Sequence, residues 1–230
     1  MEKLTANIMK KLAKRTGADL CGIASVDRFN GAPEGFRPKD IFPATESVVV
    51  VVKRFPLGAL RSKNPIPYSF AGEVVRMSVQ KLICDLSLRL QEMGISAVPV
   101  PSEPYMYWNE ERKEGKGILS LRHAGYLAGL GVLGRNTLLI NEKYGNCISL
   151  GALLLDAPLE SDPIATYKVC EDDCNACIKS CPVNALDGKS VVQGLCRERS
   201  QMVTPRGYEV YMCNKCRVIC PNCRGVRQKK

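Results

Sequence analysis

The first 160 residues of the chain divide into segments of helical apolar spacing and short, continuous apolar runs. Apolar residues at positions 4, 8 and 12 end at Gly17, which predicts a helix capped by that glycine and followed by a strand over 19–25. Five consecutive valines within 47–53 indicate a central strand that is buried on both faces and covered by helices. A long apolar stripe predicts a helix over about 73–93, closed by Gly94.

The remaining segments of this region are shorter. Proline and glycine mark loops at 29–43 and 55–67, and the pattern predicts a strand over 95–100, an irregular stretch over 101–117 and a helix over 118–128. Two strands around a turn at 142–146 are expected to pair as a hairpin that ends at Leu155. This order of elements indicates a layered α+β fold instead of a regular βαβ succession.

Cysteine usage divides the chain into two unequal domains. Residues 1–162 are poor in cysteine, whereas residues 163–230 hold nine of the twelve cysteines. We therefore expect an α+β body over 1–162 and a metal-binding domain over 163–230. The cysteines of the second part are Cys170, Cys174, Cys177, Cys181, Cys196, Cys213, Cys216, Cys220 and Cys223.

Two of the cysteine runs end in Cys-Pro, the ligand pattern of a ferredoxin with two [4Fe-4S] clusters. Closely spaced thiolates in a tight turn converge on one cube, and the last cysteine of each run serves the other cluster. The first gap, Cys170-x3-Cys174, is one residue longer than in the bacterial pattern. The crossover rule gives the following two sets: Cys170, Cys174, Cys177 and Cys220 for one cube, and Cys181, Cys196, Cys213 and Cys216 for the other.

Two other uses of these cysteines stay open at this point. The pairs at 174/177 and 213/216 could form a four-thiolate zinc site, and a disulfide framework would also consume cysteines. Zinc leaves too many cysteines unexplained, and disulfide frameworks are typical of small secreted domains. Cys223 has no assigned partner; it could replace a neighbour as ligand or remain a free thiol.

The charge and hydropathy of the chain restrict its partners. The longest unbroken apolar run is 48–52, so we expect a cytoplasmic protein without membrane contact. The formal net charge is +10, and basic residues gather at the C-terminus: Arg217, Arg224, Arg227, Lys229 and Lys230. They could dock an acidic redox partner protein that donates electrons, or form a solvated tail. No aromatic residue is interleaved with them, which argues against a nucleic-acid partner.

Residues 129–134 satisfy the dinucleotide pattern G-x-G-x-x-G, and Asp156 follows at a suitable distance. That mechanism needs a strand before the glycines and a helix after them. Here a helix is predicted before them and a strand after them. We therefore expect these glycines to turn the chain or to admit a close backbone approach.

The same region carries a family resemblance: HAGYLAGLGVLGRNTLLI at 123–140, Tyr144-Gly145, and the segment 150–159. Together with Cys21-Gly22-Ile23-Ala24, Arg37-Pro38-Lys39-Asp40 and both cysteine runs, they resemble the epoxyqueuosine reductase family. The resemblance implies an α+β body of the cobalamin-processing and reductive-dehalogenase group, which holds base-off cobalamin against a ferredoxin-like two-cluster domain. The implied corrinoid contacts are Gly131, Gly134, Arg135, Asn136 and Thr137.

The chain also departs from that family. The family's proton-donating aspartate has no counterpart in 100–116, where Glu103 and Tyr105 are the substitutes that we expect to act as catalytic proton donors. The tRNA-processing members continue beyond the second cysteine run, so we expect a small-molecule substrate other than tRNA. The sole histidine, His123, lacks an aspartate two residues before it and is expected to pack within a helix. The hypothesis is thus a cobalamin-dependent reductase, and the alternative is a ferredoxin-like carrier that passes electrons to a separate partner.

Overall fold

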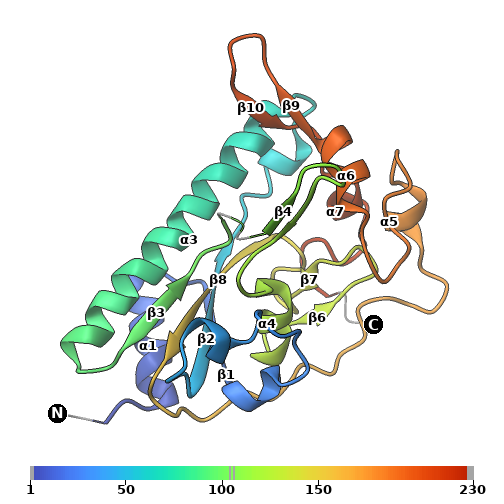
Figure 1. Cartoon of the computed structure of the whole chain (residues 1–230). Coiled ribbons are helices and arrows are strands. Elements are labelled where there is room, and N and C mark those ends of the chain that lie inside the picture. Colours follow the sequence, from blue (N-terminus) through green and yellow to red (C-terminus); the bar gives the residue numbers. More distant parts are fainter. Residues whose placement is uncertain (1–2, 104, 106, 227–230) are drawn as a thin grey trace.

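The computed structural model describes residues 3–103, 105 and 107–226 (Figure 1). Its centre is a four-stranded sheet in the order β1-β2-β8-β3, in which all neighbours are antiparallel. The strands are β1 (Leu20–Ser25), β2 (Ser47–Arg54), β3 (Ala97–Val100) and β8 (Ile148–Leu155). The antiparallel pairing confirms the predicted α+β class.

The valine strand β2 joins two hydrophobic cores because alternate side chains of a strand point to opposite faces. Val49 and Val51 pack with residues of α1 (Ala6–Thr16) and α3 (Ile66–Glu92). Val48, Val50 and Val52 pack on the other face with residues of α4 (Leu121–Leu127). Figure 1 shows α1 and α3 on one side of the sheet and α4 on the other. The prediction of a central strand covered by helices is confirmed.

Helix boundaries differ from the sequence prediction in two places. Helix α3 begins at Ile66, earlier than expected, because Pro67 lies in its first turn, where proline is compatible with a helix. The loop expected over 29–43 contains the short helix α2 (Pro38–Ile41). Two 3-10 turns lie at Val26–Phe29 and Ala59–Arg61.

The predicted hairpin around 142–146 is wrong. Strand β7 (Leu139–Ile140) pairs with β6 (Val132–Leu133), whereas β8 pairs with β2 along its whole length and with β3 over 152–155. At the predicted turn there is only an isolated bridge between Asn141 and Gly145. The stretch over 101–117, expected to be irregular, contains a small hairpin of β4 (Tyr107–Asn109) and β5 (Glu114–Lys116).

The cysteine-rich tail follows β8 and contains only short elements: α5 (Ala176–Lys179), α6 (Gln193–Ser200), β9 (Gln201–Val203), β10 (Glu209–Tyr211) and α7 (Lys215–Val218). The β9–β10 hairpin reaches the first part of α3, where the Tyr211 N–H donates to Ser69 Oγ at 3.0 Å (Figure 1). Within the described part of the chain, no helix is both long and apolar enough to span a bilayer.

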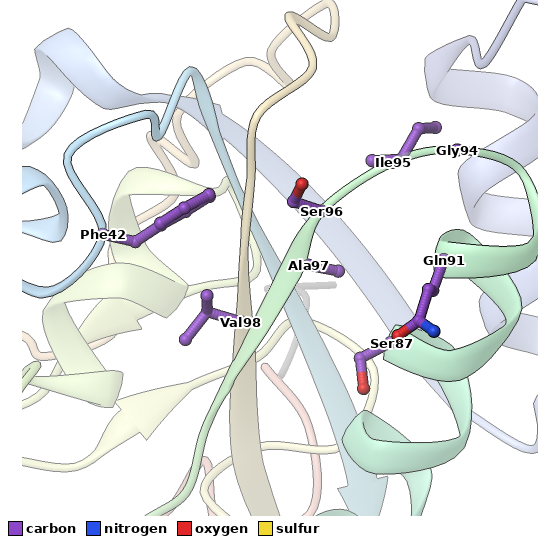
Figure 2. Close-up of a pocket in the computed structure, with 8 residues that line it drawn as sticks. All are labelled: Phe42, Ser87, Gln91, Gly94, Ile95, Ser96, Ala97 and Val98. Atoms are coloured by element: carbon purple, nitrogen blue, oxygen red, sulfur yellow. The ribbon is translucent and has the colours of Figure 1, made fainter.

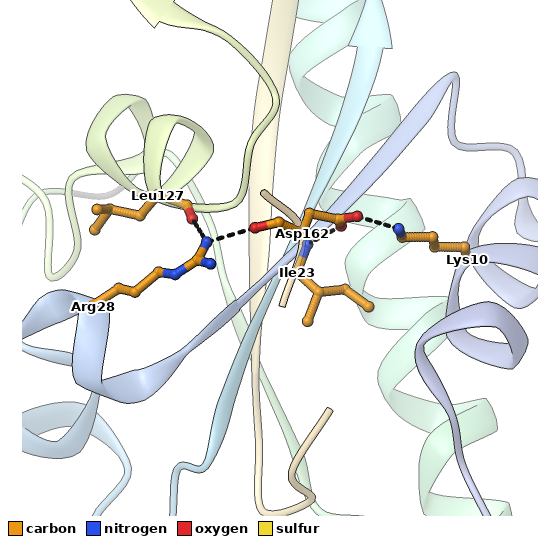
Figure 3. A network of polar contacts seen from close by, with 5 residues as sticks. All are labelled: Lys10, Ile23, Arg28, Leu127 and Asp162. Carbon is orange, nitrogen blue, oxygen red and sulfur yellow. Dashed lines mark hydrogen bonds and ion pairs between the residues drawn. The ribbon is translucent and has the colours of Figure 1, made fainter. Parts of the chain in front are cut away.

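Asp162 fixes the start of the tail to the body (Figure 3). Its carboxylate pairs with Lys10 of α1 and accepts a hydrogen bond of 2.9 Å from the Ile23 N–H of β1. The Arg28 guanidinium donates to the Asp162 carbonyl at 2.7 Å and to the Leu127 carbonyl of α4 at 2.6 Å. One short segment therefore joins α1, β1 and α4.

Candidate metal centres

The two cysteine runs form a structural repeat. Each reads Cys-Asn-x-Cys-x-x-x-Cys-Pro, starting at Cys174 and at Cys213. Asn175 and Asn214 precede short helices with almost the same backbone angles, φ −131° and ψ 20° against φ −132° and ψ 15°. The helices that follow, α5 and α7, contact each other. The repeat therefore places equivalent cysteines of the two runs side by side.

One group of cysteines lines a small crevice between the tail and the glycine-rich segment of the body. Its sulfur-bearing lining consists of Cys170, Cys174, Cys177 and Cys220. Burial raises the pKa of Cys220 to about 11, and the neighbouring thiols of Cys170 and Cys177 act in the same direction. Three cysteines of the first run and the last cysteine of the second thus share one site.

The other four cysteines interact with one another in the same way. Burial, followed by the thiols of Cys196 and Cys213, raises the pKa of Cys216 to about 11. The pKa of Cys196 is also raised, first by burial and then by Cys213 and Cys181. Crowded, half-buried thiols are unfavourable as thiolates unless a cation compensates their charge. These interactions link Cys196 with Cys181 and Cys213, and Cys216 with Cys196 and Cys213, all members of the second set given by the crossover rule.

The two groups are also close to each other, because the thiol of Cys177 contributes to the raised pKa of Cys216. All twelve cysteines are free thiols. Among the residues that the structure describes, no three Cys, His, Asp or Glu side chains gather as tightly as a single metal ion requires. The case for metal binding therefore rests on the two sets of four cysteines, each of which would hold a [4Fe-4S] cluster and not a single metal ion.

Arg135 and Asn136 of the body hold the tail. The Arg135 guanidinium donates to the carbonyl oxygens of Cys174 and Asp172 at 2.7 and 2.9 Å. The Asn136 amide donates to the Cys216 carbonyl at 3.1 Å, and Asn136 is 3% exposed. The two side chains thus contact both cysteine runs, so they position the candidate metal ligands.

The other three residues expected to contact a corrinoid are also occupied by internal contacts. A Cβ on Gly131 would lie 2.5 Å from the Ile140 carbonyl oxygen, and one on Gly134 would lie 2.6 Å from the Ile140 side chain. Thr137 has φ +61°, and its hydroxyl accepts a hydrogen bond of 2.8 Å from Arg122. These glycines admit close packing, and helix α4 precedes them while β7 follows, as the sequence predicted.

The two candidate proton donors lie in different environments. Glu103 pairs with Arg76 of α3 at 3.7 Å. Tyr105 stacks on Trp108 with ring centroids 6.4 Å apart, and the Arg197 guanidinium of α6 lies 5.3 Å from its ring centre. Tyr105 thus contacts Trp108 of β4 and Arg197 of the tail, whereas Glu103 lies against α3.

His123 lies in α4 as expected, but it is exposed and not packed. Its Nδ1 lies 2.7 Å from Ser120 Oγ, and partial desolvation, followed by the charge of Arg122, lowers its pKa. Among the C-terminal basic residues, the Arg217 guanidinium donates to the Asn146 carbonyl oxygen. Arg227 and the two final lysines lie outside the described residues.

A pair of cysteines that sequence reasoning missed lies beside the first group. Cys147 and Cys223 have their sulfur atoms 3.3 Å apart and are 2% and 7% exposed. The mutual hydrogen bond raises the pKa of Cys147 and lowers that of Cys223 to about 7. Cys147 is isolated in the sequence, so no spacing signal could have revealed the pair.

A separate hollow lies between the C-terminal end of α3 and strand β3 (Figure 2). Phe42 faces Ser96 across it, and Ser87 and Gln91 of α3 form its other wall. None of the candidate site residues lines it.

No protein-family profile matches the chain. An epoxyqueuosine reductase from Staphylococcus aureus is 33% identical over 125 residues, which are 50% of this chain and 32% of that protein. The match thus spans about a third of the length of that relative. The resemblance read from the sequence is confirmed over about half of the chain.

Two solved structures share the fold. One is an epoxyqueuosine reductase with an epoxyqueuosine-modified tRNA stem loop, with a TM-score of 0.65, 19% identity, and coverage of 97% of this chain and 66% of that one. The other is a reductive dehalogenase associated with B12-dependent dehalogenation, with a TM-score of 0.70, 19% identity, and coverage of 94% and 31%. The predicted fold group is confirmed.

Proposed function

We propose that this chain, a relative of the epoxyqueuosine reductases, is an iron–sulfur redox protein in which residues 163–230 carry two [4Fe-4S] clusters. Cys170, Cys174, Cys177 and Cys220 would hold one, and Cys181, Cys196, Cys213 and Cys216 the other. The observation that best supports the proposal is the crevice lined by Cys170, Cys174, Cys177 and Cys220, which brings three cysteines of the first run beside one of the second.

The residues present fit such a cofactor. Besides cysteine, the crevice of the first group is lined mainly by the apolar residues Ile140, Val169, Ala176 and Pro221, together with Arg135 and Asn136. Low polarity and limited solvent access are among the features by which proteins set cluster potentials. The contact of α5 with α7 supports short-range electron exchange between the two groups.

The metal test is iron and sulfide analysis after anaerobic reconstitution. About eight iron and eight sulfide ions per chain are expected for two cubes. Cys177→Ala and Cys216→Ala should each lose about half of the iron, because each removes a ligand from a different group. Cys84→Ala is the matched control, since Cys84 is exposed on α3. Zinc without labile sulfide would contradict the proposal.

We further propose that the α+β body, residues 1–162, makes the protein a corrinoid-dependent reductase. The fold shared with a B12-dependent dehalogenase supports this step. The side chains of Arg135, Asn136 and Thr137 do not form a corrinoid cradle, because they bind carbonyl oxygens of the tail or Arg122. A bound corrinoid would supply a cobalt centre that accepts electrons from the clusters. We derive no reaction step through it, and assign Arg135 and Asn136 to positioning the tail.

A titration tests the corrinoid. Cob(II)alamin added to the reconstituted protein should give the spectral change of four-coordinate cobalt if the body binds it base-off. No binding at high micromolar concentration would end the corrinoid proposal. The iron–sulfur proposal would survive that result as its alternative, a ferredoxin-like carrier for a separate redox partner.

For catalysis, Tyr105 is better placed than Glu103 as the proton donor. A phenol beside a guanidinium can donate a proton, and Arg197 lies against the ring of Tyr105, whereas Glu103 is paired with Arg76. Tyr105→Phe should slow turnover and leave iron content unchanged. Tyr107→Phe, two residues further along the chain in β4, is the control.

We propose a substrate other than tRNA. The Arg217 guanidinium donates a hydrogen bond to the Asn146 carbonyl oxygen, so this basic side chain is not available to bind a phosphate backbone. This contact supports the proposal. The direct test offers the epoxyqueuosine-modified tRNA stem loop and a halogenated aromatic to the reduced protein. Conversion of the stem loop would contradict the proposal.

A further inference from the structure

Cys147 and Cys223 lie at the junction of body and tail and belong to neither four-cysteine group. Cys147 directly precedes β8, and Cys223 follows the candidate ligand Cys220 by three residues. Their sulfur atoms are 3.3 Å apart although the residues are 76 positions apart in sequence. Sequence separation of this size means that folding, and not chain proximity, brings the two thiols together.

The backbone around both cysteines is held in place. The Cys147 carbonyl accepts a hydrogen bond of 2.8 Å from Phe55 N–H, and the Cys223 N–H donates to the Cys220 carbonyl at 2.9 Å. A Cβ on Gly145 would lie 2.4 Å from the Cys223 carbonyl, so only glycine at that position allows the approach. The thiols therefore face each other in a fixed arrangement.

The surroundings of the pair are largely apolar, apart from the Arg217 guanidinium, which contacts the Cys147 thiol, and the charges of Arg217 and Arg224, which act on Cys223. The two cysteines form one buried cluster with Phe55, Leu60 and Ala71. The Asn146 side-chain oxygen lies 3.7 Å from the Cys147 sulfur, at the limit of a weak contact. A disulfide has its sulfur atoms about 2 Å apart, so a movement of roughly 1 Å would close the bond.

We propose that Cys147 and Cys223 are a redox-active dithiol that closes to a disulfide between the body and the cysteine-rich tail, with a low-molecular-weight disulfide as oxidant. The Cys223 thiolate, the more exposed of the two, attacks one oxidant sulfur, and the oxidant's S–S bond breaks to release one thiol. The Cys147 thiolate then attacks the Cys223 sulfur and displaces the second thiol. Two cysteine sulfurs are oxidised, two oxidant sulfurs are reduced, and the two cysteine protons end on the released thiols.

Closure would tie the segment that carries Cys220 to the body. Cys220 packs against the same cluster as the pair, so the redox state of the pair acts on the position of a candidate cluster ligand. This inference goes beyond the proposed clusters and does not require them, because neither Cys147 nor Cys223 is among the eight proposed ligands.

The test equilibrates the anaerobically reconstituted protein in buffers with rising ratios of oxidised to reduced glutathione. After acid quenching, free thiols are alkylated in denaturant, and the digest is analysed by mass spectrometry. We expect the loss of two alkylated thiols and the appearance of a Cys147–Cys223 peptide. Cys147→Ser and Cys223→Ser should abolish that peptide, whereas Cys84→Ser should retain it.

Three results would overturn the inference: both thiols staying alkylatable at every ratio, Cys223 joining another cysteine instead, or Cys223→Ser losing iron, which would make Cys223 a cluster ligand. Iron is measured in the same samples. Absence of iron from the unmodified protein would refute the proposed clusters, and the cross-linked peptide would still report on the pair.

Discussion

Gly145 offers a direct test of how the tail docks on the body. Its φ is +60°, and a Cβ built on it would lie 2.1 Å from the Asn222 carbonyl oxygen and 2.4 Å from the Cys223 carbonyl carbon. In Gly145→Ala the left-handed backbone alone costs about 1–2 kcal/mol. The clash is with backbone, which cannot rotate away, and overpacking of this kind costs about 1–3 kcal/mol more. We therefore expect a loss of about 2–5 kcal/mol in the free energy of unfolding.

Gly35→Ala is the matched control. Gly35 has φ +81°, but nothing lies within 4 Å of the position that a Cβ would take there, so only the backbone cost of about 1–2 kcal/mol applies. Urea unfolding followed by circular dichroism measures both variants, and iron analysis follows the clusters. Gly145→Ala should also lose iron, because the displaced segment begins next to Cys220. Equal destabilisation of the two variants, with equal iron, would refute the docking described for residues 222–223.

Three further predictions concern single side chains. Asp162→Asn should lower the free energy of unfolding by about 1–3 kcal/mol, because a charge-assisted hydrogen bond and an ion pair are lost together, and urea unfolding measures this. The pKa of Asp187 is lowered to about 2, chiefly by hydrogen bonds from Ser190, so its charge stabilises the fold above about pH 4 and this contribution disappears as the pH falls through 2. Asp187→Ala should flatten the pH dependence of unfolding in that window; an unchanged curve would contradict it. Burial raises the pKa of Cys21 to about 12, so iodoacetamide at pH 8 should modify the exposed Cys84 and spare Cys21, as peptide mass spectrometry would show.

Much of the body could be predicted because its signals are local. The valines at 48–52 have no polar face, so they specify a strand between two apolar layers. Gly17 has φ +111° and ends α1 as expected. Such local patterns specify a strand or a helix end without reference to distant segments, so the sequence alone is sufficient to predict these elements.

The errors concern pairings that depend on distant segments. The apolar run at 148–155 has no mark that distinguishes a hairpin partner of 139–140 from a strand inserted between β2 and β3. The β4–β5 hairpin lacks an alternation of buried and exposed apolar residues, since Tyr107 and Trp108 are consecutive in β4 and both are exposed. Competition between strands for edges is a tertiary effect, and no local pattern encodes it.

Only part of the candidate metal site could likewise be predicted from local sequence signals. Cysteine spacing predicts which thiols gather, since the crossover follows from the repeated run. It gives no information on Asn136, a buried amide that contacts the second run, or on Cys147, whose partner is 76 positions away. Both act through surfaces that exist only after the tail has docked.

The exchange of final cysteines between the two runs bears on how the protein matures. Under the proposed assignment, the group around Cys177 lacks its fourth ligand until Cys220 has been synthesised and folded back. A nascent chain that has emerged only as far as Cys181 therefore has no complete cube to fill. Under that assignment, iron can fill the site around Cys177 only after the tail has folded back, whereas the ligands of the other site are all present once Cys216 has emerged.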